Sequence, residues 1–308
     1  MKDDQLQPTH RPPRSLVILA FAAVYLIWGS TYLAIRIGVE TLPPFLLGGV
    51  RFAVAGTLLV ALLKFRGMAW PTARQARNSL GAGAVMLLGG NGLVVWAEQH
   101  VSSSFAALFI ASVPVWFAVF DWMRPGGSRP PWHVWSGIGL GLAGVGLLVA
   151  RQETGAGGIH WSGAVALLLA TMSWAFGSML AKHSDKPPSP WMGAALQMVG
   201  GGVVMCVTAV ARGELAEFDA TAVSGGSFAA LTYLIVFGSW IGFSAYVWLL
   251  EVVSPAKVST YAYVNPVIAV FLGWALLGEQ VTSPMLLAAA VIVVAVVILT
   301  WPRPAVRT

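Results

Sequence analysis

The stretch with the richest side-chain chemistry in this sequence runs from Ser254 to Pro266, near the C-terminal end. Two tyrosines, an asparagine and a proline occur there within an apolar run: Tyr261, Tyr263, Asn265 and Pro266. A proline inside a helix removes one N–H donor, so the helix must bend or find another donor. Because polar groups are costly in hydrocarbon, the polar face of this helix should contact protein or water and not lipid. The stretch therefore predicts a hinge that also carries ligand-binding groups.

The composition places this stretch in a membrane protein. Of the 308 residues, 57% are hydrophobic and only 10% are charged, against roughly 25% charged residues in soluble domains. Apolar runs of about 20 residues, the length that crosses a bilayer core, recur ten times. The expected spans are Leu16–Val39, Pro44–Leu63, Leu80–Ala97, Phe105–Met123, Val134–Ala150, Gly163–Ala181, Met192–Ala211, Phe228–Leu250, Val258–Leu277 and Met285–Trp301.

The positive charges indicate orientation and not nucleic-acid binding. The net charge is +6, but the basic residues are scattered at helix ends without a basic stripe. If the spans alternate in direction, 14 of the 18 basic residues fall on one side, which predicts that this side and both termini are cytoplasmic. We expect residues 1–15 to be a disordered cytoplasmic tail, and a location in the bacterial inner membrane.

Residues that could support an enzyme or a metal centre are sparse. Cys206 is the only cysteine, which excludes an internal disulfide, and the histidines lack the spacing of paired metal ligands. The GxGxxG motif from Gly139 to Gly144 follows no strand, so we interpret its glycines as contacts between membrane helices. We expect no enzymatic activity, no metal and no cofactor.

The chain repeats itself. A shift of 152 residues places Gly90 on Gly242, Trp96 on Trp248 and Pro114 on Pro266. Each half then holds five spans, over 16–151 and 160–302, and an odd number inverts the second half relative to the first. Inverted repeats with broken helices at matching positions are typical of alternating-access carriers. Pro114 and Pro266 are the predicted hinges.

Several residues inside the spans are candidates for lining a cavity. Trp28 lies about 12 residues into the first span, roughly 18 Å along the axis, which is deep for an interfacial aromatic residue. Arg51 is costly within a span and needs a partner, for which Glu98 and Glu40 are the candidates. It can contact substrate, or it can reach toward the membrane surface. Asn91 can bind a ligand or join helices.

Four segments resemble the EamA-type branch of the drug/metabolite transporter superfamily. They are Trp28-Gly-Ser-Thr-Tyr32, Arg51-Phe52, Asn91-Gly-Leu-Val-Val-Trp-Ala-Glu98, and Ser254 to Pro266 with Gly278-Glu279. The resemblance covers both halves of the chain. It implies an all-α bundle of ten transmembrane helices, arranged as two inverted five-helix repeats around a central cavity. The substrate-binding candidates that we take forward are Trp28, Ser30, Asn91, Trp96, Trp174, Trp248, Tyr261, Tyr263 and Asn265, with Arg51 and Glu98 as charge or gating residues.

Two functions remain open from the sequence. The first is export of small metabolites, chiefly amino acids including aromatic or neutral ones, by alternating access. The alternative is efflux of drugs or lipophilic cations. The expected partners are a small-molecule substrate and the lipid bilayer, with no nucleic acid, and a monomer is the simplest assembly.

Overall fold

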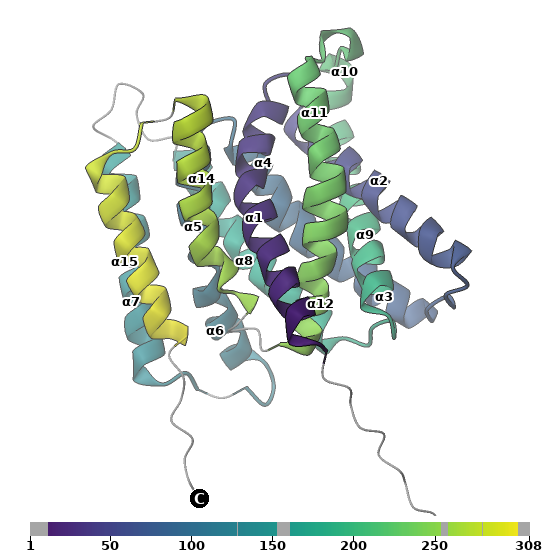
Figure 1. The fold of residues 1–308 in the computed structure, drawn as a ribbon, viewed down its shortest axis with the longest axis horizontal. Coiled ribbons are helices and arrows are strands. Elements are labelled where there is room, and N and C mark those ends of the chain that lie inside the picture. Colours follow the sequence, from purple (N-terminus) through teal and green to yellow (C-terminus); the bar gives the residue numbers. More distant parts are fainter. Residues whose placement is uncertain (1–11, 128, 153–160, 254–257, 279, 301–308) are drawn as a thin grey trace, which may run out of the picture.

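The computed structural model describes residues 12–127, 129–152, 161–253, 258–278 and 280–300, and every regular element within them is a helix (Figure 1). In the first half these are α1 (Arg14–Gly38), α2 (Pro44–Phe65), α3 (Ala73–Gly83), the π-helix η1 (Ala84–Gly92), α4 (Leu93–Ala97), α5 (Ser103–Ile110), α6 (Val113–Met123) and α7 (Trp132–Gln152). In the second half they are α8 (Trp161–His183), α9 (Pro190–Ala211), α10 (Glu214–Glu217), η2 (Ala220–Ala222), α11 (Gly225–Tyr233), the π-helix η3 (Leu234–Phe243), α12 (Ser244–Val252), α14 (Tyr261–Leu277) and α15 (Ser283–Thr300).

Each predicted apolar run coincides with a helix or with consecutive helical segments. Within the described ranges, six helices are long and apolar enough to cross a membrane. The chain is therefore an all-helical, polytopic membrane protein. The six are Arg14–Gly38, Pro44–Phe65, Ala73–Ala97, Trp161–His183, Pro190–Ala211 and Gly225–Val252.

The outer surface of the bundle carries large apolar side chains. Leu58 on α2, Val207 on α9 and Phe228 on α11 are between 49% and 65% exposed. A soluble protein rarely exposes contiguous apolar surface on this scale, whereas lipid tails solvate it without cost. This exposure fits helices whose outer faces contact the bilayer.

The helices pack with partners far apart in sequence. The most extensive helix–helix contacts join α2 to α9 and α7 to α15. These two pairs lie at opposite sides of the bundle in Figure 1. Helix α1 stands between them and packs on α14, η3, α11 and α12. The first helix of the chain is therefore surrounded largely by elements of the second half.

Two helices change their winding in the middle. The π-helical segments η1 and η3 occupy matching places in the two halves, because adding 152 to 84–92 gives 236–244, beside the observed 234–243. Both contain glycines, Gly90 and Gly242 among them. A π-helical insertion turns the side chains beyond it to new directions, and such insertions occur often at functional sites.

The two predicted hinge prolines lie in different backbone settings. The predicted fourth span is interrupted at residues 111–112, between α5 and α6, and Pro114 lies in the first turn of α6, where its missing N–H costs little. Helix α14 instead runs without interruption from Tyr261 through position 266. The side chains of Pro266 and Tyr263, and residues 1–11 of the predicted tail, lie outside the described part of the structure.

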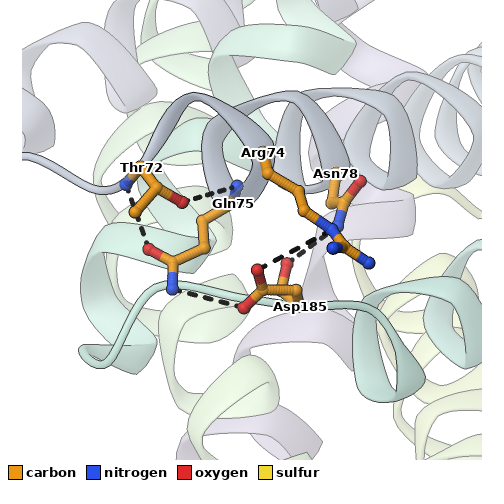
Figure 2. A network of polar contacts seen from close by, with 5 residues as sticks. All are labelled: Thr72, Arg74, Gln75, Asn78 and Asp185. Carbon is orange, nitrogen blue, oxygen red and sulfur yellow. Dashed lines mark hydrogen bonds and ion pairs between the residues drawn. The ribbon is translucent and has the colours of Figure 1, made fainter.

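A polar network joins the two halves at the end of the bundle where α8 finishes. Figure 2 shows Asp185 beside the first turns of α3, where its carboxylate accepts a hydrogen bond from Gln75 Nε2 at 3.2 Å and its backbone carbonyl accepts one from Asn78 Nδ2 at 3.0 Å. Thr72 and Gln75 form a capping box that fixes the start of α3. The next residue, Lys186, pairs with Glu251 of α12 at 3.1 Å. The loop after α8 thus ties α3 to α12.

Candidate functional site: a central cavity

A cavity lies between α1, α2, the junction of η1 and α4, the break between α5 and α6, α8 and α14. Its wall includes the predicted residues Trp28, Arg51, Asn91, Trp174 and Tyr261. The empty space is about 510 Å³ with its mouth included, and the part in which the centre of a water molecule fits is about 60 Å³. Since ~10–15 Å³ of such space holds one water, the cavity holds a few waters in this conformation. The walls must move apart to admit a larger solute.

An aromatic cluster forms one side of the cavity. Around the Trp28 ring lie Trp174 at 5.4 Å, Tyr246 at 4.9 Å and Tyr261 at 5.1 Å between centroids. The contacts with Trp174 and Tyr261 are edge-to-face, the arrangement that the ring quadrupoles favour. The cluster joins four helices from both halves, and three of its rings, Trp28, Trp174 and Tyr261, line the cavity.

Hydrogen bonds hold this cluster in place. The indole N–H of Trp28 donates to the backbone carbonyl of Gly238 in η3 at 3.2 Å. The hydroxyls of Tyr246 and Ser178 lie 2.9 Å apart, and Ser178 also donates to the backbone carbonyl of Trp174 at 2.7 Å. Both hydroxyl groups are fully buried. The positions of these rings are therefore fixed by polar contacts as well as by packing.

The two tryptophans pack in a reciprocal way on the π-helical segments. A Cβ atom on Gly242 of η3 would lie 2.6 Å from Trp28 Nε1, and one on Gly90 of η1 would lie 2.9 Å from a Trp174 ring carbon. Each tryptophan thus comes from the first helix of one half and packs on a π-helical glycine of the other half. These are the two glycines that the 152-residue shift superimposes.

Arg51 is the charged group of the cavity wall and is only 3% exposed. Its Nε donates to Ser239 Oγ at 2.9 Å and its Nη1 to Asn91 Oδ1 at 3.4 Å. The guanidinium also lies 4.5 Å from the centre of the Phe52 ring. The two predicted carboxylate partners, Glu98 and Glu40, are not among these contacts. Within the described ranges, no ion pair includes Arg51.

Four of the other predicted residues, Ser30, Trp96, Trp248 and Glu98, are not part of the cavity wall. Ser30 bonds to Tyr233 of α11 at 2.6 Å, and Trp96 packs against His100 with 4.7 Å between ring centroids. Trp248 is half-buried against the hydrophobic core. Glu98 is fully buried, and its backbone carbonyl accepts a hydrogen bond from Arg36 at 2.5 Å.

Asn265 joins helices. With its amide oriented to satisfy its neighbours, its nitrogen donates to the backbone carbonyls of Tyr25 and Tyr261, both at 3.1 Å. The Tyr25 hydroxyl in turn lies 2.6 Å from Thr260 Oγ1. The polar groups at the start of α14 therefore hold it against α1.

Several residues of the site were not singled out from the sequence as ligand candidates. Ser239 and Tyr246 come from the span that contains η3, whereas Tyr32 of α1 and Ser178 of α8 come from helices that pack on η3 and η1. A serine or tyrosine within an apolar span is a usable signal, but it does not say which neighbour the side chain meets. Within the described ranges, no three His, Cys, Asp or Glu residues gather in a way that could hold a metal ion.

Comparison with known proteins identifies the family. The model of the EamA-like transporter family matches twice, over residues 15–150 and 161–301. An uncharacterized inner membrane transporter of Escherichia coli strain K12, YedA, is 42% identical over 283 residues, covering 91% of this chain and 89% of YedA. A WAT1-related chloroplastic protein of Arabidopsis thaliana is 27% identical over 91% of this chain and 68% of its own length.

A solved crystal structure shares the fold. It superposes with a TM-score of 0.66 at 19% sequence identity, covering 93% of this chain and 97% of the other. With two family matches that together cover most of the chain, this chain belongs to the EamA-like transporter family and is a membrane transporter.

Proposed function

We propose that this protein is a secondary transporter that exports small metabolites, with amino acids, including aromatic or neutral ones, as the leading substrate class. The observation that carries the proposal is the central cavity, where Trp28, Trp174 and Tyr261 face the same space as Arg51 and Asn91. Aromatic faces suit the apolar body of a solute, while a few convergent polar groups orient its head. Such a wall matches a zwitterion with an apolar side chain.

The mechanism that we propose is alternating access by two inverted five-helix repeats with ten spans. Three observations support it: the double match of the family model, the matching π-helical segments, and the reciprocal contacts of Trp28 and Trp174 with glycines of the opposite half. The cavity is lined by the halves of α1 and α2 that lie nearest their connection. The Asp185 and Lys186 contacts close the opposite end.

We place the protein in the bacterial inner membrane with both termini in the cytoplasm. The relative YedA is an inner membrane transporter by name, and the distribution of lysine and arginine predicts the orientation. In that orientation the structure is closed toward the cytoplasm. Thiol labelling of single cysteines placed in the α1–α2 and α2–α3 connections tests it, since only the former should react from outside intact cells.

Flux through reconstituted protein tests the substrate class. Liposomes loaded with radiolabelled neutral and aromatic amino acids should lose label faster with the protein than without it. Replacing Trp28 by Ala should abolish the difference, because three ring contacts and one hydrogen bond converge on this side chain. A broad amino-acid panel without any protein-dependent flux would exclude this class.

The aromatic cluster favours a second substrate class, lipophilic cations. Ring faces attract an organic cation through their quadrupole, and the attraction is strongest where water is excluded. Trp28 and Tyr261, which both line the cavity, give such faces. Lower accumulation of a cationic dye in cells that express the protein, compared with cells that express its Trp28→Ala variant, would support this class.

A further inference from the structure

The Arg51 guanidinium is a buried cation whose contacts are neutral. It is held by the Ser239 hydroxyl, the Asn91 amide oxygen and the face of Phe52. Two of its five N–H groups are used by these hydrogen bonds, which leaves donors beside the cavity that Arg51 lines. Within the described ranges, no carboxylate oxygen lies within 4 Å of its nitrogen atoms.

A cation in this position is costly without a counter-charge. Desolvating an arginine within a membrane span costs several kcal/mol, and neutral hydrogen-bond partners offset only part of that cost. A carboxylate that enters the cavity supplies the missing negative charge. The planar guanidinium can bind it through two parallel hydrogen bonds, which a point charge such as lysine cannot reproduce.

The neighbouring groups suit the same ligand. Because Asn91 gives its carbonyl oxygen to Arg51, its NH₂ group is left as a donor on the same wall. The Trp174 ring also lines the cavity. Its indole nitrogen is buried behind the wall, close to the Tyr246 and Tyr261 hydroxyls but without a well-formed hydrogen bond among the described residues. The wall thus offers donors, which an anion needs and a cation does not.

We infer that Arg51, oriented by Ser239 and Asn91, binds the carboxylate of the transported solute. The protein then selects solutes in which a carboxylate is joined to an apolar or aromatic body, and it rejects solutes whose only charge is positive. The inference rests on the proposed transport function and sharpens it, since it separates the two substrate classes that remain open above.

The first test needs no variant. Binding of four molecules with the same phenyl body to the purified full-length protein is measured by thermal shift and by isothermal titration: phenylalanine, its methyl ester, phenethylamine and 3-phenylpropanoate. Phenylalanine and 3-phenylpropanoate should bind, and the ester and the amine should bind at least about 30-fold more weakly, the ratio expected for losing one partner of a buried charge pair.

The second test changes the arginine. Arg51→Gln should remove the preference for acid over ester, and Arg51→Lys should retain part of it. Arg212→Gln is the matched control, because this arginine also lies over an aromatic ring, Phe45 at 5.6 Å, but does not line the cavity. If Arg51→Gln does not fold, Ser239→Ala keeps the charge while removing the hydroxyl that orients it, and should weaken acid binding several-fold.

The outcomes separate this inference from the proposed function. Binding of 3-phenylpropanoate without binding of phenylalanine would support the carboxylate site and contradict amino-acid export. Equal binding of the ester, the amine and the acids would overturn the carboxylate site and leave transport intact. A wild-type protein that binds neither carboxylate, tested alongside a flux assay, would overturn the site even where flux of another solute is found.

Discussion

Trp28 packs so closely on Gly242 that a methyl group at position 242 would lie 2.6 Å from its indole nitrogen. The contact joins the first helix of one half to the π-helical segment of the other. Because Trp174 meets Gly90 in the same manner, the aromatic cluster depends on two glycines that leave room for the two indoles. The same aromatic cluster therefore forms part of the cavity wall and holds the two halves together.

We predict that Gly242→Ala displaces Trp28 and destabilises the protein by about 1–3 kcal/mol, the usual cost of overpacking. Gly81→Ala is the matched control, since a Cβ there meets nothing within 4 Å. That change should instead stabilise the helix by about 0.5–1 kcal/mol. Both variants are measured in detergent by thermal unfolding and tryptophan emission. Equal melting temperatures of the two variants would show that the space around Gly242 accommodates a methyl group.

The buried hydroxyl pair of Tyr246 and Ser178 should behave as a single interaction. Tyr246→Phe removes it while Ser178 keeps its bond to the Trp174 carbonyl, so the loss should be about 0.6–1.5 kcal/mol. In the double variant with Ser178→Ala, the loss should be smaller than the sum of the two single losses. Fully additive losses in a denaturant series would contradict a direct bond.

Much of the fold could be predicted from the sequence, because the length and apolarity of each run determine where helices lie. The π-helical turns at Ala84–Gly92 and Leu234–Phe243 could not, since they alter which side chains face inward without changing composition. Trp28 and Trp96 look alike as tryptophans within apolar spans. Only the packing of neighbouring helices separates Trp28, in the cavity wall, from Trp96, which packs on His100.

The same limit applies to the charged and amide residues. The cost of burial correctly predicts that Arg51 has partners. The expected side of the membrane indicated Glu98 and Glu40, and could not indicate Ser239, which lies 188 residues away. The sequence predicts that Asn265 binds substrate, because a polar side chain within a membrane span needs a polar partner. In the structure the backbone carbonyls of Tyr25 and Tyr261 are such partners. A contact of Asn265 with substrate stays a prediction.

Asn265 should accordingly affect stability more than affinity. Asn265→Leu removes a donor from two backbone carbonyls and should cost about 1–2 kcal/mol. Tyr25→Phe, which removes only the hydroxyl contact to Thr260, should cost less, because the carbonyl bond to Asn265 remains. Unfolding midpoints and substrate affinity are measured on both variants. A large fall in the affinity of Asn265→Leu at unchanged stability would place this amide in the binding site after all.

The last prediction concerns the closed end of the bundle. The ion pair of Lys186 and Glu251 has side chains that are 40% and 25% exposed, so it contributes at most about 1 kcal/mol and can break during transport. Gln197 lines a small hollow beside this pair and is 4% exposed. A cysteine at position 197, in a chain whose Cys206 is replaced by Ser, therefore reports the opening of this end.

In the Gln197→Cys reporter chain, Glu251→Gln should raise the rate of labelling by a thiol reagent by up to about 5-fold, the factor that corresponds to about 1 kcal/mol. Added salt should raise the rate of the parent chain toward that of the variant, because it screens the ion pair. Exchanging the charges, with Lys186→Glu and Glu251→Lys together, should restore slow labelling. Equal rates in all three chains would mean that the contacts of Asp185 with α3, or helix packing, close this end without the ion pair.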